Sequence, residues 1–172
     1  MKVGFQAPDF TLPSTNDHEW SLSKYSGQTV VLLFYPKNET LMCTKQMCSV
    51  RDNWNKYLAT KAVIVGISPG TIEQHRSFIN NHRLPLTLLS DVNRTVTKTY
   101  GSHRWFPIWT TRAVVVIDSK GFVRYQRIIV RAFRPTDYSV LSAIYAARAD
   151  ETIERYNQLS KTFWTRKSAP DL

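Results

Sequence analysis

Residues 30–35, Val-Val-Leu-Leu-Phe-Tyr, form a continuous β-prone apolar run, which is typical of a central strand covered on both faces. A helical pattern follows at residues 43–58, where apolar side chains recur at steps of three and four. Residues 62–68 form the next buried strand, closed by the turn signal Pro69-Gly70. A strand, a helix and a second buried strand make a βαβ unit, so the chain is predicted to be of the α/β class.

The rest of the chain continues this alternation. Thr71 suits the N-cap of a helix that reaches about residue 81. The other expected elements are a short strand at 86–89, a short helix at 93–100, a β-hairpin with strands at 113–117 and 123–130, a helix from Pro135 to at least 148, and a second helical stretch at 151–163. This order resembles a thioredoxin-like fold, with a central mixed sheet flanked by helices.

No linker or repeat divides the sequence. We expect one domain at residues 1–148, followed by a C-terminal helical extension and tail at 149–172. This extension is expected either to cover the domain's own surface, which is the favoured alternative, or to make a subunit contact. The first ten residues lack the apolar stretch of a secretion signal, and no apolar run approaches the roughly 18 residues that cross a bilayer. The prediction is a soluble, cytoplasmic protein without membrane contact.

Two cysteines are too few for a disulfide scaffold in 172 residues, and the histidines show no metal-ligand spacing to them. No metal or cofactor is therefore expected. Cys43 and Cys48 stand five positions apart, and such a pair in a reducing cytosol more often serves redox chemistry than a permanent bridge. The alternative is that both are small buried apolar residues.

Cys43 has the place that a reactive cysteine needs. It follows a buried strand and a polar loop, and it lies where a helix begins. Reactive groups of α/β sheets lie at this carboxyl end of a strand. The unpaired N–H groups of a helix start stabilise a thiolate, which is the nucleophilic form of the side chain.

Pro36, Thr40 and Cys43 have the spacing P-x-x-x-T-x-x-C, and here the sequence resembles the peroxiredoxins. The C-x-x-x-x-C spacing of Cys43 and Cys48 resembles the Q-type branch, the bacterioferritin comigratory proteins. The resemblance covers about residues 1–148. Two further segments carry it: the opening Gly4, Ala7, Pro8, Asp9 and Phe10, and residues 110–118, which are similar to the strand bearing the family's active-site arginine and thus assign Arg112.

The resemblance implies a thiol peroxidase. Cys43 would attack hydrogen peroxide or an organic hydroperoxide and become a sulfenic acid. The Thr40 hydroxyl would hydrogen-bond the peroxide and the thiolate, and Arg112 would hold a positive charge beside both. Pro36 would shield the site from water.

Cys48 would then condense with the sulfenic acid to form an intramolecular disulfide, which thioredoxin or a similar dithiol would reduce. Gln46 stands where the family often has a glutamate that orients the threonine. The chain also departs from the family at Leu41-Met42, where Pro-Gly is usual. We expect a monomer or a weak homodimer.

Two other functions are weighed against the peroxidase. A thioredoxin-like disulfide oxidoreductase would normally use C-x-x-C, so the wider spacing here and the Thr40–Arg112 pair argue against it. The net charge of +10 raises nucleic-acid binding. However, the bases are spread singly through strand-like sequence, so a basic surface without nucleic acid is favoured.

Overall fold

The computed structural model describes residues 2–101, 112–129 and 135–167. A five-stranded sheet has the order β5-β4-β3-β6-β7. Its strands are β3 (Val30–Phe34), β4 (Val63–Ser68), β5 (Thr87–Ser90), β6 (Arg112–Ile117) and β7 (Val123–Ile129). Strands β3, β4 and β5 run parallel, whereas β6 is antiparallel to both β3 and β7. The predicted mixed sheet of a thioredoxin-like fold is confirmed.

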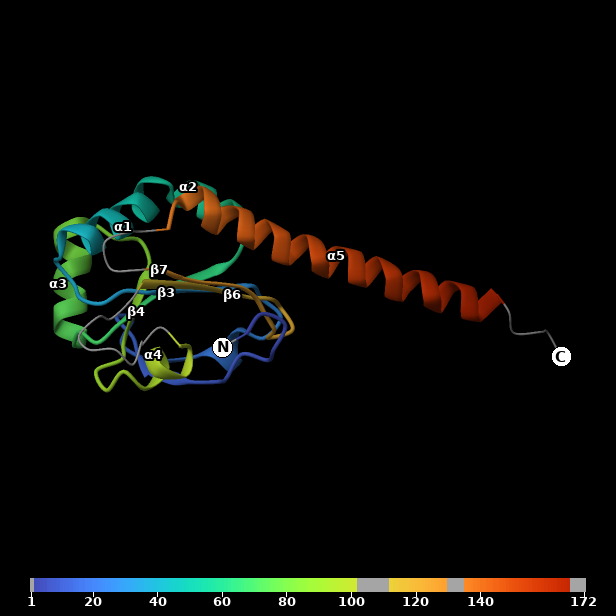
Figure 1. Cartoon of the computed structure of the whole chain (residues 1–172), viewed down its shortest axis with the longest axis horizontal. Coiled ribbons are helices and arrows are strands. Elements are labelled where there is room, and N and C mark those ends of the chain that lie inside the picture. Colours follow the sequence, from blue (N-terminus) through green and yellow to red (C-terminus); the bar gives the residue numbers. More distant parts are fainter. Residues whose placement is uncertain (1, 102–111, 130–134, 168–172) are drawn as a thin grey trace.

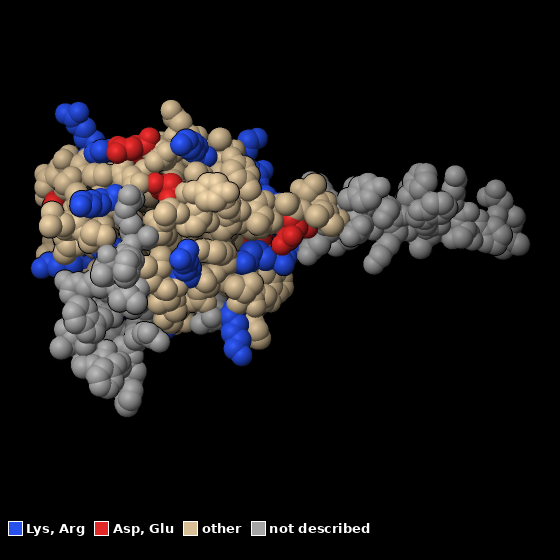
Figure 2. All heavy atoms as spheres, turned by 45° about the horizontal axis from the view of Figure 1, so that its top comes forward, with Lys and Arg blue, Asp and Glu red and all other residues tan. Residues whose placement is uncertain are grey.

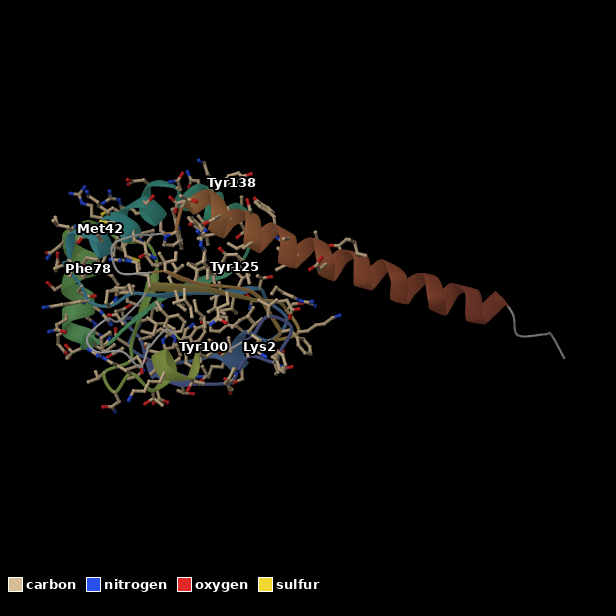
Figure 3. The ribbon with its side chains drawn as sticks, in the orientation of Figure 1. Lys2, Met42, Phe78, Tyr100, Tyr125 and Tyr138 are labelled. Atoms are coloured by element: carbon tan, nitrogen blue, oxygen red, sulfur yellow. The ribbon has the colours of Figure 1, made fainter. Side chains whose placement is uncertain are left out.

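Helices cover both faces of this sheet (Figure 1). One face carries α1 (Leu41–Asp52), α2 (Trp54–Ala59), α3 (Ile72–His82) and the start of α5 (Asp137–Lys167). The other face carries the β-hairpin of β1 (Thr11–Pro13) and β2 (Glu19–Ser21), the 3-10 turn η1 (Leu22–Tyr25) and α4 (Thr95–Thr99). In Figure 3, Phe78 and Tyr125 lie on the first side of the sheet and Tyr100 on the second.

Strand alternation divides the core into these two layers. The layer of α1, α3 and α5 receives the odd-numbered side chains of strand β3 and its extension, Val31, Leu33 and Tyr35. The same layer holds Cys43 and Met47. Val30, Leu32 and Phe34 point into the opposite layer, which also holds Trp20 and Tyr100. On β6, Val114 and Val116 face the first layer and Ala113 and Val115 the second. Arg112, two residues before Val114, therefore begins on the same face as Cys43.

The helix predicted at 43–58 is two helices. It begins at Leu41 and is interrupted at Asn53, between α1 and α2. The Asn53 amide donates a hydrogen bond of 3.1 Å to the Ser49 carbonyl, and its backbone leaves the helical region at ψ 16°. Asparagine competes in this way with helical hydrogen bonding, so the period of apolar residues alone did not reveal the break.

The two C-terminal helical stretches predicted from the sequence are one continuous helix. Thr136 caps α5, because its hydroxyl accepts a hydrogen bond of 3.2 Å from the Ser139 N–H, and the helix runs unbroken to Lys167. No break occurs near residue 148. Figure 1 shows the later part of α5 extending away from the sheet, so the expectation that the extension covers the domain is wrong. Within the described residues, no helix is both long and apolar enough to cross a membrane.

Candidate active site

The loop at residues 36–40 carries the chain from β3 to α1 at the carboxyl edge of the central strand. Tyr35 extends the strand pairing with a backbone hydrogen bond of 3.0 Å to Ile67. The helix then begins at Leu41 and places Cys43 in its first turn, fully buried. The first-turn N–H groups of a helix have no partner within it and carry partial positive charge. The local fold thus places the Cys43 side chain at the positive end of a helix.

Arg112 supplies a full positive charge to the same sulfur. Its Nη2 donates a hydrogen bond of 3.2 Å to Cys43 Sγ, and its side chain is 1% exposed. The register that pairs Phe34 with Ala113 places the start of β6 beside the end of β3, so residues 69 apart in sequence meet. A buried guanidinium requires a compensating acceptor, and a thiolate is one.

Thr40 occupies the N-cap position of α1. Its carbonyl accepts a hydrogen bond of 2.8 Å from the Thr44 N–H, and its backbone has the extended conformation of a cap. Its side chain, however, makes no capping hydrogen bond. Thr71 does the opposite at α3, where it forms a complete capping box with Gln74. The Thr40 hydroxyl is therefore not required to start its helix and is available to another partner.

Cys48 lies on α1 with Cys43, half-buried, and both thiols are free. On a regular helix, residues five apart have Cα atoms about 8–9 Å apart and point roughly 140° away from each other. A disulfide needs Cα atoms within about 7 Å and converging side chains. Helix α1 therefore keeps the two sulfurs apart, and joining them requires the helix to unwind.

Gln46 and Pro36, the other two residues singled out from the sequence, differ in their surroundings. Gln46 is 2% exposed on α1, and its amide makes no hydrogen bond to any part of the chain that the structure describes. Gln46 therefore makes no hydrogen bond to Thr40, the residue that the family's glutamate at this position often orients. Pro36 is partly exposed and lines a cleft of about 470 Å³ beside the loop. Other residues of this cleft are Lys37, Pro69, Gln74, Val92 and Arg94.

Asp137, the first residue of α5, is a contact that the sequence did not reveal. Its carboxylate accepts hydrogen bonds from Ser49, from Asn53 at 3.4 Å and from Tyr57 at 2.7 Å. Burial and the bond to Asp137 raise the pKa of Tyr57. These partners fix the end of α1, directly after Cys48, to α5. They lie 80 or more residues from Asp137, and no local pattern marks them.

Neither a metal-ligand cluster nor, on the face drawn in Figure 2, a basic patch occurs among the described residues around the site. Among the described residues, no group of three His, Cys, Asp or Glu side chains is placed to hold a metal ion. Figure 2 shows the Lys and Arg side chains spread singly over the face of α1, α2 and α5, without the continuous patch typical of a nucleic-acid interface.

Comparison with known proteins gives a consistent result. The profile of the AhpC/TSA family matches residues 3–126. The putative peroxiredoxin bcp of Coxiella burnetii is 36% identical over 146 residues, covering 84% of this chain and 88% of that protein. The chloroplastic peroxiredoxin Q of Triticum aestivum is 42% identical over 126 residues, 73% of this chain, and the match spans only 58% of the wheat protein's length.

Two solved structures have the same fold. Peroxidoxin BcpB from Mycobacterium tuberculosis superposes with a TM-score of 0.73 at 31% identity, over 87% of this chain and 97% of that one. The reduced 2-Cys peroxiredoxin of Plasmodium vivax gives a TM-score of 0.79 over 87% and 98% of the two chains. Its identity of 23% makes it evidence for the fold alone.

Proposed function

Since the chain belongs to the AhpC/TSA family, whose members include the peroxiredoxins, we propose that it is a thiol peroxidase that reduces hydroperoxides with Cys43. One observation carries the proposal. The buried Arg112 guanidinium donates a 3.2 Å hydrogen bond to the sulfur of a cysteine in the first turn of a helix. A structural cysteine has no need of a buried cation, whereas a nucleophilic thiolate does.

The first step is a displacement at oxygen. The Cys43 thiolate attacks the terminal oxygen of ROOH, a sulfur–oxygen bond forms, and the peroxide O–O bond breaks. Sulfur is oxidised to a sulfenic acid, and the departing RO⁻ takes up a proton to leave as an alcohol, or as water when R is hydrogen. Arg112 stabilises the negative charge as it moves from sulfur to the departing oxygen. The Thr40 hydroxyl, free of any capping role, orients the peroxide.

The second step uses Cys48. Its thiol attacks the Cys43 sulfenic acid, a disulfide forms, and the hydroxyl leaves as water. Because the regular helix holds the two sulfurs apart, α1 unwinds between Cys43 and Cys48 in this step. A thioredoxin-type dithiol then restores both thiols by exchange and is itself oxidised to a disulfide.

The cleft beside Pro36 supports substrates larger than hydrogen peroxide. Its volume of about 470 Å³ leaves room for the organic group of a hydroperoxide. Its lining combines the apolar side chains of Pro36, Pro69 and Val92 with the polar side chains of Lys37 and Arg94. A cytoplasmic location and a monomer or weak homodimer are also parts of this proposal.

The test is peroxide consumption by the purified protein with a thioredoxin system. We expect turnover with hydrogen peroxide and with organic hydroperoxides. Cys43→Ser should abolish it, and Cys48→Ser should allow only a single oxidation of Cys43. A protein that reduces disulfides but leaves peroxide untouched would be the alternative, a thioredoxin-like oxidoreductase.

A further inference from the structure

The loop before Cys43 is held from beneath by a buried chain of hydrogen bonds. The Tyr35 hydroxyl donates to Asn38 Oδ1 at 2.9 Å, and Asn38 Nδ2 donates to His75 Nδ1 at 2.9 Å. The chain ends at Leu89, whose carbonyl accepts from His75 Nε2 at 3.2 Å. It connects the end of β3, the loop, helix α3 and strand β5, and neither the sequence motif nor the proposed chemistry assigns it a role.

The hydrogen bonds have one direction. His75 Nδ1 accepts a hydrogen bond, so its proton is on Nε2 and the ring is neutral. Burial of the ring, which is fully shielded from solvent, lowers the pKa of His75 and favours this neutral form. The Oδ1 and Nδ2 atoms of Asn38 both have hydrogen-bond partners, so the amide is held in one orientation.

The surrounding packing restricts the movement of these hydrogen-bonded side chains. A methyl group at Gly70 would lie 2.9 Å from His75 Cε1 and 3.1 Å from Asn38 Nδ2. A Cβ at Gly66 would lie 3.2 Å from the Tyr35 ring. Glycine at both positions lets the backbone of β4 and of the following turn lie directly against these side chains, which fixes them in place.

The first residue of this hydrogen-bond chain, Tyr35, belongs to the core layer that holds the reactive sulfur. Tyr35 packs in the same core layer as Cys43, and negative charge on Cys43 contributes to the raised pKa of Tyr35, whose main cause is burial. Asn38 precedes Thr40 by two residues and Cys43 by five. Arg112, in contrast, is fixed by strand β6. The position of the loop therefore determines where Thr40 and Cys43 lie relative to the Arg112 guanidinium, which is held by strand β6.

We infer that Asn38 is a positioning residue of the peroxidase site, held by Tyr35 and His75, and that it aligns Thr40 and Cys43 with Arg112. The inference rests on the proposed function. Misplacement of reacting groups by about 1 Å can lower a rate by about a hundredfold. Reaction with peroxide needs thiolate, hydroxyl and guanidinium in alignment, whereas alkylation by iodoacetamide needs the thiolate alone.

Glu39 offers a matched control on the same loop. Its carboxylate accepts hydrogen bonds from Asn81 at 3.1 Å and His82 at 2.9 Å, so it also joins the loop to α3. This contact lies at the surface, with the Glu39 side chain 49% exposed, and exposed ion pairs contribute little to stability. If any contact between loop and α3 sufficed, Glu39→Gln and Asn38→Ala would behave alike.

The experiment compares two rates in the reduced protein: oxidation by hydrogen peroxide, followed by stopped-flow tryptophan fluorescence, and alkylation by iodoacetamide in the Cys48→Ser background. We expect Asn38→Ala and His75→Leu to lower the peroxide rate about tenfold to a hundredfold. Their alkylation rates should change less than about threefold, and Glu39→Gln should leave both rates near wild type. His75→Gln should recover most of the peroxide rate, because its amide can accept from Asn38 and donate to Leu89.

A peroxide rate for Asn38→Ala within twofold of an active wild type would refute the inference and leave the proposed function intact. The peroxide and alkylation rates could instead fall equally, in parallel with the thermal stability and without rescue by His75→Gln. That result would show that the hydrogen bonds of Tyr35, Asn38 and His75 have only a structural role. A wild-type protein that does not react with peroxide would refute the proposed function itself.

Discussion

The Arg112 guanidinium and the Cys43 sulfur lie 3.2 Å apart inside the core, although Cys43 belongs to α1, which follows β3, and Arg112 begins the neighbouring strand β6. Loss of this contact should strongly lower the rate of the proposed reaction. Removing one preorganised donor to developing negative charge typically lowers a rate by about a hundredfold to a thousandfold.

We therefore expect Arg112→Ala to slow peroxide reduction by about that factor and to slow alkylation of Cys43 at neutral pH. Arg112→Lys should restore only part of the rate, because an ammonium lacks the planar fork of a guanidinium. Arg127, an exposed arginine on β7, is the control, and its replacement by alanine should change neither rate. A normal peroxide rate in Arg112→Ala would mean that another cation serves Cys43.

Thr40→Val tests the free hydroxyl at the helix start. Because Thr40 makes no capping hydrogen bond, valine should leave the melting temperature nearly unchanged. The peroxide rate should fall about tenfold to a hundredfold, as expected for a lost hydrogen bond to a charged group. Thr71→Val should do the reverse, losing about 1 kcal/mol with the capping box of α3 while keeping activity. A stability loss in Thr40→Val that accounts for its lost rate would make Thr40 a cap only.

Unwinding of α1 should be visible by hydrogen exchange. In the reduced protein, residues 43–52 are helical and should be protected, whereas in the oxidised protein the first turns should exchange faster. Helix α3, which holds neither cysteine, serves as the internal reference. Equal protection of α1 in both redox forms, with the Cys43–Cys48 bond verified by mass spectrometry, would show that no such unwinding occurs.

The carboxylate of Asp137 should resist that unwinding, because it binds Ser49 directly after Cys48. Ser49→Ala removes this hydrogen bond, and we expect disulfide formation after peroxide addition to accelerate about threefold or more. Ser139→Ala, a change near the same end of α5 that does not contact Asp137, should leave the rate unchanged. The measurement is quenched-flow trapping of free thiols. An unchanged rate in Ser49→Ala would place the limiting movement elsewhere.

The buried His75 predicts a pH dependence of stability. Its pKa lies below the usual 6.5 because burial disfavours the charged ring, so the unfolded chain binds the proton first as pH falls. Its contribution is complete above about pH 6.5 and is lost as pH falls toward the lowered pKa of the folded state. Melting temperatures measured between pH 8 and 5 should fall less steeply for His75→Gln than for wild type.

The sequence predicted the sheet well and the helix faces less well. Continuous apolar runs such as residues 30–35 have one interpretation, a strand buried on both faces. On α5, the spacing of Tyr138, Leu141, Ile144 and Tyr145 in the sequence predicts one apolar face, but the two tyrosines are 82% and 52% exposed. The buried stripe is Val140, Ala143, Ile144 and Ala147. Small residues lie against the sheet because they permit close approach, which a hydrophobicity pattern does not register.

The residues of the candidate site also differ in how far the sequence predicts them. Cys43 and Cys48 could be proposed from their spacing and from the place of Cys43 at a helix start, whereas Pro36 and Thr40 were assigned through the family resemblance. Arg112 was reached only through the family resemblance, and its 3.2 Å contact depends on strand pairing. His75 and Asp137 carried no signal in the sequence, because Asn38 is 37 residues from His75 and the partners of Asp137 are 80 or more residues away, so that only tertiary packing brings them together.

The pairing of β6 with β3 has a chemical consequence. Side chains alternate along a strand, so sliding β6 by one position would turn Arg112 toward the layer of Trp20 and Tyr100 and offer Cys43 the methyl group of Ala113 instead. Residues 113–117 are apolar on both faces, and either alignment would bury nearly as much hydrocarbon. The shifted alignment would carry the cost of a buried cation without its anion. The nucleophile thus helps to select the strand alignment on which its own reactivity depends.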